Sequence, residues 1–164
     1  MDNPQATGSD AYGSGREFKI TAAMLKQLPA AGGQIILGDL PLGTVTQMTR
    51  LWITAAVTGV GSCTAQLATV DMSQSPPVVV NSFGSALDVT QAPSATTAPV
   101  QQLATGNVEP INKPTALALI IAGATVNAAT GGAFSAFARY VSIAPAPALR
   151  YDTTAQTPRV MPAY

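Results

Sequence analysis

The chain has 164 residues, of which 47% are hydrophobic and 10% are charged, and its eight basic and eight acidic residues cancel. This composition predicts one folded domain with a sizeable core and excludes the polar, highly charged make-up of a disordered chain. Neutrality and scattered basic residues argue against nucleic-acid binding, which normally needs a basic patch. So little charge favours a surface covered by partners, although the abundant Thr, Ser, Gln and Asn offer an uncharged hydrated surface as the alternative.

Targeting signals are not expected in this sequence. Residues 1–18, MDNPQATGSDAYGSGREF, contain neither an apolar stretch nor a basic leader of the secretory kind. No uninterrupted apolar run approaches the ~18 residues of a membrane span. The single cysteine, Cys63, cannot form an intrachain disulfide, which is compatible with folding in a reducing cytoplasm. We therefore expect a soluble protein made in a cytoplasm, without membrane association.

The N-terminal part of the chain divides into an arm and a short element. Residues 1–17 are rich in Gly, Ser, Asp and Asn and predict a flexible or extended arm that carries Tyr12. In residues 18–28, apolar side chains recur near helical spacing, and Thr21 could begin a helix that Pro29 would end. A short helix near residues 21–28 is therefore expected, with the alternative that EFKIT is a strand.

From residue 34 onward, strand-like segments alternate with turn residues. The expected strands are residues 34–37, 44–57, 63–70, 78–80 with 85–89 (two short strands or one interrupted strand), 100–103, 115–122 and 133–143. Many short strands without a convincing long helix predict an all-β domain over residues 18–143, either an antiparallel β-sandwich or a barrel.

The longest of these strands, residues 44–57, has two distinct faces. One face carries Thr49, Leu51, Ile53, Ala55 and Val57, and the other carries Met48, Arg50, Trp52 and Thr54. Trp52 could pack in the core, anchor a subunit contact or stack on a sugar, and the first two readings are favoured over the third.

Residues 144–164 predict an extended, Pro-rich C-terminal arm. Four prolines exclude a helix, yet the arm contains apolar residues at intervals: Leu149, Tyr151, Val160, Met161 and Tyr164. Such an arm could lie on a neighbouring subunit, or it could fold back over its own domain.

The sequence offers no recognisable catalytic chemistry. It contains no histidine, which removes the usual catalytic triads and the commonest metal ligand. Cys63 lies on an apolar face and is expected to be a buried, inert thiol. Asp39 and Asp71 occupy turn positions, where Asp accepts hydrogen bonds from the backbone. We therefore predict neither an enzyme nor a cofactor or metal site.

Three stretches carry a family resemblance: IILGDLPLGTVTQMTRLWI, CTAQLATVD and TALALIIAGATVNAATGGAFSAFARYVSI. The first has a strand ending in Gly-x-Leu-Pro-x-Gly, and the third has a Gly-rich turn before a strand that closes on a tyrosine. The positions are Gly38, Leu40, Pro41, Gly43, Gly132 and Tyr140. Over residues 34–143 the chain resembles the small β-sandwich virion proteins of tailed bacteriophages, such as head decoration (cement) proteins.

The resemblance implies a jelly-roll-like sandwich that is present in many copies on a virus particle. The expected function is a capsid decoration protein that bridges capsomers of the major capsid protein, with a homotrimer favoured. A neck, tail or fibre component and a carbohydrate-binding module are the alternatives. The candidate subunit or capsid contacts are Trp52, Arg50, Met48, Tyr12, Leu149, Tyr151, Val160, Met161 and Tyr164.

Overall fold

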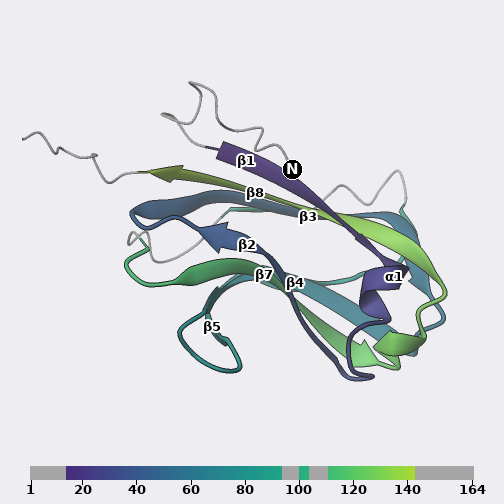
Figure 1. Cartoon of the computed structure of the whole chain (residues 1–164). Helices are drawn as coiled ribbons and strands as arrows, with labels where there is room; N and C mark the ends of the chain where they lie inside the picture. The colour runs from purple at the N-terminus through teal and green to yellow at the C-terminus, as the bar shows by residue number, and fades with distance from the viewer. Residues whose placement is uncertain (1–13, 94–99, 104–110, 143–164) are drawn as a thin grey trace, which may run out of the picture.

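A computed structural model describes residues 14–93, 100–103 and 111–142. Its elements follow one another along the chain with little helix between them (Figure 1). They are β1 (Ser14–Thr21), α1 (Ala22–Leu25), β2 (Gly32–Leu40), β3 (Thr44–Thr58), β4 (Ser62–Asp71), β5 (Val78–Asp88), β6 (Val100–Leu103), β7 (Thr115–Ala124), the 3-10 helix η2 (Val126–Ala128) and β8 (Gly131–Ser142).

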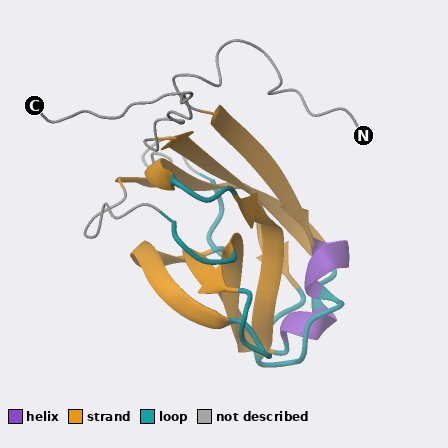
Figure 2. Cartoon of the chain, turned by 60° about the vertical axis from the view of Figure 1, so that its left-hand side comes forward, coloured by secondary structure: helices purple, strands orange, loops and turns teal. Residues whose placement is uncertain are grey.

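The strands form two four-stranded antiparallel sheets that pack face to face (Figure 2). One sheet has the order β1-β8-β3-β6 and the other has the order β2-β7-β4-β5. Consecutive strands along β1 to β4 alternate between the two sheets, and the chain returns so that β8 lies beside β1 and β7 lies beside β2. Eight strands in this order make a jelly roll, which confirms the predicted antiparallel sandwich and its jelly-roll-like topology.

The N-terminal prediction was partly wrong. The stretch EFKIT is part of β1, which pairs with β8 in unbroken register from Ser14↔Tyr140 to Thr21↔Ala133. The strand therefore begins four residues inside the arm that was expected over residues 1–17. The helix expected near residues 21–28 covers only Ala22–Leu25. After it the chain continues in tighter turns, in which Gln27 N and Leu28 N donate to the carbonyl oxygens of Met24 and Leu25.

The later strands agree closely with the predicted ranges. β6 coincides with the predicted segment 100–103, and β3, β4, β7 and β8 begin or end within two residues of expectation. The two short segments expected at 78–80 and 85–89 are one continuous strand, β5, because both pair with β4. Register shifts in this pairing, between Ala65 and Leu67 and between Thr69 and Val70, explain why the sequence pattern looked interrupted.

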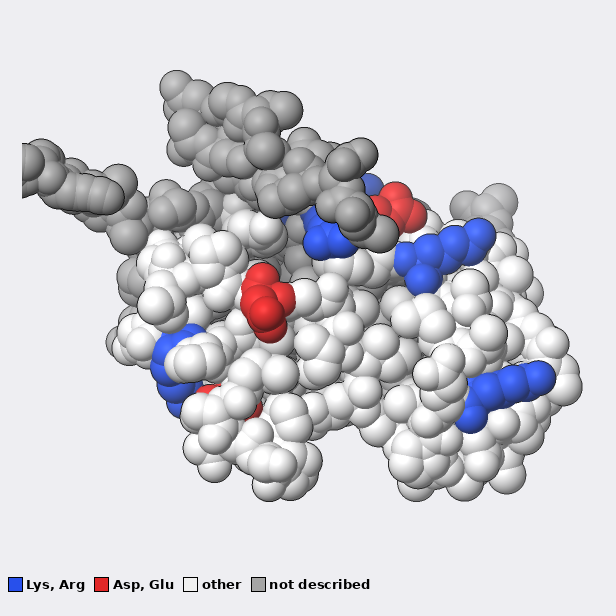
Figure 3. Space-filling view, viewed as in Figure 1, with Lys and Arg blue, Asp and Glu red and all other residues white. Residues whose placement is uncertain are grey.

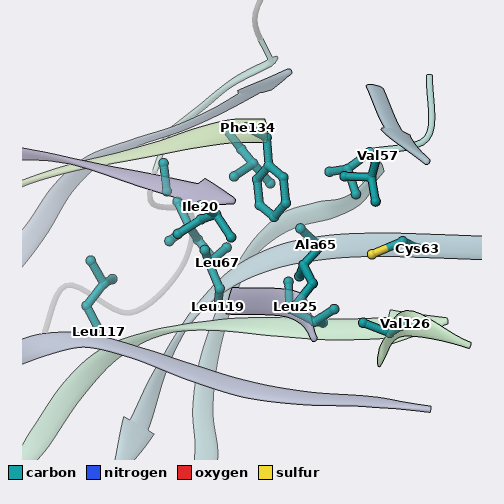
Figure 4. Close-up of a cluster of buried hydrophobic side chains, with 14 of the residues drawn as sticks. Ile20, Leu25, Val57, Cys63, Ala65, Leu67, Leu117, Leu119, Val126 and Phe134 are labelled. Atoms are coloured by element: carbon teal, nitrogen blue, oxygen red, sulfur yellow. The ribbon is translucent and has the colours of Figure 1, made fainter. Parts of the chain in front are cut away.

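The core lies between the two sheets. Figure 4 shows side chains from both layers pointing into one cluster, with Ile20 and Phe134 opposite Leu67 and Leu119. Each of these four side chains is at most 1% exposed. Leu25 of α1 joins them and is fully buried, so the short helix closes one end of the sandwich. Burial of this alternating apolar face is the main force that holds the layers together.

A second, smaller cluster lies on the outer face of the β2-β7-β4-β5 sheet. Val70, Ala116 and Ala118 are fully buried there although they point away from the main core. The segment between β4 and β5 extends across this face towards β2. Gln34 Nε2 of β2 donates a hydrogen bond of 3.0 Å to the carbonyl oxygen of Pro77 in that segment. Small side chains on β7 suit this close approach of a loop to the sheet.

Candidate assembly surface

Asp71 and Asp88 accept hydrogen bonds in turns, as predicted for Asp71. The prediction of a turn position for Asp39 was wrong, because Asp39 lies within β2 and pairs with Ala116. Within residues 14–93, 100–103 and 111–142, no three His, Cys, Asp or Glu side chains come close enough to hold a metal ion. Asp88 accepts hydrogen bonds from Thr90 N (3.0 Å), Thr90 Oγ1 (2.6 Å) and Gln91 Nε2 (3.0 Å). The bonds from Thr90 are the main cause of the lowered pKa of Asp88, and they shape the turn after β5.

Asp71 ties two segments together at one end of the sandwich. Its Oδ2 accepts a hydrogen bond from Lys113 Nζ at 2.7 Å, and its Oδ1 accepts bonds from Ser73 Oγ at 2.6 Å and Ser73 N at 2.9 Å. These bonds, that of Lys113 first, lower the pKa of Asp71 from 3.8 to about 2. The carboxylate therefore links the end of β4 to the segment that precedes β7.

Acid is expected to weaken the fold through Asp71. Because its pKa is lower in the folded chain, its contribution to stability is present above the ordinary value of 3.8 and is lost as the pH falls towards about 2. Urea unfolding at several pH values between 5 and 2 measures this loss. The Asp71→Asn variant should lose less stability over that range than the wild-type chain, and Lys113→Met should lose an intermediate amount. Equal slopes for all three proteins would contradict the assignment.

Cys63 is fully buried on the core face of β4, as predicted. Burial, and secondarily the negative charge of Asp88, raise the pKa of its thiol above the ordinary value. The neutral thiol is a poor nucleophile, so this arrangement suits packing rather than chemistry.

Trp52 lies on the outer face of the β1-β8-β3-β6 sheet. Its strand neighbours Leu51 and Thr49 are fully buried on the opposite face, and its partner across the sheet is Ser135. Trp52 and Met48 are half-buried and Arg50 is exposed. Trp52 therefore does not belong to the core between the sheets. It also brings the three predicted contact residues of β3 onto one face.

One further aromatic residue shares this outer face. Phe137 pairs with Arg50, two residues along β8 from the partner of Trp52. Its ring covers Gly15 so closely that a Cβ atom built there would lie 2.7 Å from Phe137 Cζ. Phe137 thus packs along the sheet, and it does not make the row of exposed rings that a carbohydrate-binding face needs.

The remaining predicted contacts, Tyr12, Leu149, Tyr151, Val160, Met161 and Tyr164, lie outside the described residues.

Five of the six exposed large apolar side chains among the described residues lie in the turn between β2 and β3, in the segment between β4 and β5 or at the start of β5, and the sixth, Ile36, lies within β2. These connections lie at the end of the sandwich away from α1 (Figure 1). At this end the turn between β2 and β3 and the segment before β7 are joined by backbone hydrogen bonds, Gly43 N to the oxygen of Ile111 and Ile111 N to the oxygen of Thr44. We call it the apolar end, and its exposed members are Leu42 (65%), Met72 (38%), Val78 (53%), Val79 (40%) and Val80 (52%).

The sequence alone did not reveal the apolar end. Val78, Val79 and Val80 follow two prolines and were predicted as a strand, but a valine-rich strand is equally consistent with a buried position. Their exposure results from the position of β5 at the edge of its sheet. The signal in the sequence was three adjacent valines without the polar alternation of a half-buried strand.

Charged side chains are sparse over the face seen in Figure 3. The few lysine, arginine and acidic side chains are scattered over this face, and uncharged surface separates them. Such a surface favours contacts made by shape and apolar area over contacts made by charge. In the part of the chain that the structure describes, no helix is long and apolar enough to cross a membrane.

No protein-family model and no curated protein matches the sequence. Two solved structures resemble the fold. A chain from the capsid of Ralstonia phage GP4 superposes with a TM-score of 0.59 and 22% identity, over 80% of this chain and 85% of that one. A chain from the capsid asymmetric unit of cyanophage Pam1 superposes with a TM-score of 0.51 and 15% identity, over 85% of this chain and 96% of that one. These likenesses establish a shared sandwich fold.

Proposed function

We propose that this chain is a structural protein of a tailed-bacteriophage particle, namely a decoration (cement) protein. In this role it binds the outside of the head and stabilises the shell by bridging neighbouring capsomers of the major capsid protein. The chain acts by binding and does not catalyse a reaction.

The observation that carries the proposal is the jelly roll it shares with chains from two phage capsids. The superposition covers 85% and 96% of those two chains, so each is close in length to this one and is built around one sandwich of the same kind. A small sandwich with little charge and exposed apolar side chains suits a component that is held by many repeated contacts.

The predicted contact residues of β3 fit this role. Met48, Arg50 and Trp52 share an outer sheet face on which an apolar and a cationic group lie side by side. Trp and Arg are the residue types that most often dominate the energy of a protein interface. We assign this face to contact with the shell or with a neighbouring copy, and a trimer is the arrangement we favour.

The copy number of this chain in purified particles tests the proposal. A decoration protein should be present at a ratio near that of the main shell protein, because it repeats with the lattice. Particles from which the chain has been stripped should then open at a lower temperature than intact particles, and adding the purified chain back should restore the difference. A copy number many times lower would instead indicate a neck, tail or fibre component. Absence from the particle would overturn the virion assignment.

A further inference from the structure

The outer face of strands β1, β8 and β3 carries three cationic side chains in a regular arrangement. Lys19 of β1, Arg139 of β8 and Arg50 of β3 are exposed on it. Lys19 and Arg139 belong to this face because Ile20 and Ala138, their neighbours along the chain, are buried on the core side. The three strands form the upper layer in Figure 1, and the face is the outer side of that layer.

The strand register places these cations around two aromatic rings. Arg50 lies directly opposite Phe137, and Arg139 follows Phe137 by two residues on the same strand. Trp52 follows Arg50 by two residues on β3, and Lys19 stands in line with Trp52 across one residue of β8. At about 4.8 Å between strands and about 3.4 Å per residue, all five residues lie within about 14 Å by 10 Å. Aromatic rings beside arginine are the typical composition of the energetic centre of a protein interface.

The charges of this face are unbalanced. Glu17 is the only acidic residue on it among the described residues. Neither Lys19 nor Arg139 forms an ion pair with another described residue. Arg16 belongs to the other side of β1, where its guanidinium carbon lies 5.2 Å from the centroid of the Phe18 ring. The face therefore has a net positive charge in a chain whose total charge is zero.

Within the described chain, a second copy offers no matching acidic surface. A two-fold contact of this face with itself would place its cations against the same cations. The outer face of the other sheet has Asp39 and Asp88, but these stand on its two opposite edge strands, β2 and β5. Asp88 also accepts hydrogen bonds within its own turn. The positive face therefore fits a different protein better than another copy of this chain.

Glu17 disfavours a nucleic acid as the partner. It pairs with Phe137 and lies between the rows that contain Lys19 and Arg139. A phosphate backbone that crossed the two cations would meet this carboxylate. The Phe137 ring covers Gly15 along the sheet, so it is not presented for stacking on a base. A protein surface can instead place its carboxylates opposite the cations and leave Glu17 in water.

We infer that the outer face of β1, β8 and β3 docks on a carboxylate-rich surface of the shell protein, with Lys19, Arg50 and Arg139 facing acidic groups. Trp52 supplies the apolar contact between these charges. The inference rests on the proposed function, which provides the shell protein as the partner. It deepens that function by choosing the shell over a neighbouring copy for this face and by stating the chemistry of the shell surface.

Rebinding of the purified full-length chain to heads stripped of it tests the charges. Arg139→Glu and Lys19→Glu should each weaken binding by at least about tenfold, because each places acidic groups face to face. Lys26→Glu is the matched control, since Lys26 is exposed at the end of α1 and lies outside the three strands. It should bind within about twofold of wild type. Raising NaCl from about 0.05 M to about 0.5 M should weaken wild-type binding by at least about tenfold.

Trp52→Ala separates the apolar contact from the charges in the same assay. It should weaken binding by at least about tenfold, and by the same factor at low and high salt, because the ring carries no charge. Leu42→Ala is the matched control, because Leu42 is 65% exposed but lies at the apolar end. It should bind within about twofold of wild type. Circular dichroism checks that every variant is folded.

Several results would overturn the inference. Wild-type binding by both Arg139→Glu and Lys19→Glu would remove the charges from the contact, and a loss confined to Leu42→Ala would move the contact to the apolar end. Binding of the wild-type chain to double-stranded DNA at about 0.15 M salt, abolished by both charge reversals, would reassign the face to nucleic acid. A wild-type oligomer that both reversals dissociate would reassign it to a second copy.

Failure of the inference is distinguishable from failure of the proposed function. Heads that hold Arg139→Glu and Lys19→Glu at the same ratio to the shell protein as wild type would overturn the inference and leave the decoration role standing. Absence of the wild-type chain from purified heads would contradict the decoration role itself.

Discussion

Replacing Phe134 with alanine is expected to lower the free energy of unfolding by about 3–5 kcal/mol, the usual cost of deleting a buried aromatic ring. Phe134 is 1% exposed and lies between Ile20 of β1 and Ile53 of β3 at the centre of its sheet. The ring also reaches the opposite layer through the main core cluster. Its loss would leave a cavity that the two sheets cannot close without distorting their pairing.

Urea unfolding measures this loss, and Phe137→Ala is the matched control. Phe137 belongs to the same strand but lies on the outer face of the sheet, where it is half-buried. The same chemical change there should cost less than half as much, because part of the ring already contacts water. An equal or larger loss for Phe137→Ala would mean that the outer face contributes as much to stability as the core.

The Gly132→Ala variant is expected to be destabilised by about 3 kcal/mol or more, because two separate penalties combine. Gly132 has φ of +103°, a backbone conformation that alanine rarely adopts. A Cβ atom at this position would lie 2.3 Å from the carbonyl oxygen of Ala56 and 2.5 Å from the Cα of Val57. Both contacts are with the backbone of β3, which cannot move aside without breaking the pairing of β3 with β8.

Gly38→Ala provides the control for this prediction. Gly38 lies in β2, and a Cβ atom built on it would have no atom within 4 Å outside its chain neighbours. Thermal unfolding of the two variants should therefore show a large drop in midpoint for Gly132→Ala and a change close to zero for Gly38→Ala. A similar midpoint for both would show that the start of β8 can adjust its backbone.

The amino-acid sequence by itself determined most of the strands. Alternation in residues 44–57 and 115–122, with Pro41, Gly43 and Pro114 at their boundaries, predicted β3 and β7 because period-two burial and turn chemistry are local properties. The burial of Cys63 was predictable for the same reason, since the residues on either side of it alternate between apolar and polar.

The register of the sheets and the exposure of their edges were decided by the tertiary structure. The spacing of Phe18 and Ile20 was compatible with either a helix or a strand. These residues form a strand because β1 pairs with β8. Trp52 had several possible environments, and the opposite burial of Leu51 placed it on the outer face. Val78–Val80 are exposed at the start of β5, which is the last strand of its sheet among the described residues. Which strand lies at an edge depends on contacts distant in sequence, so local patterns cannot report it.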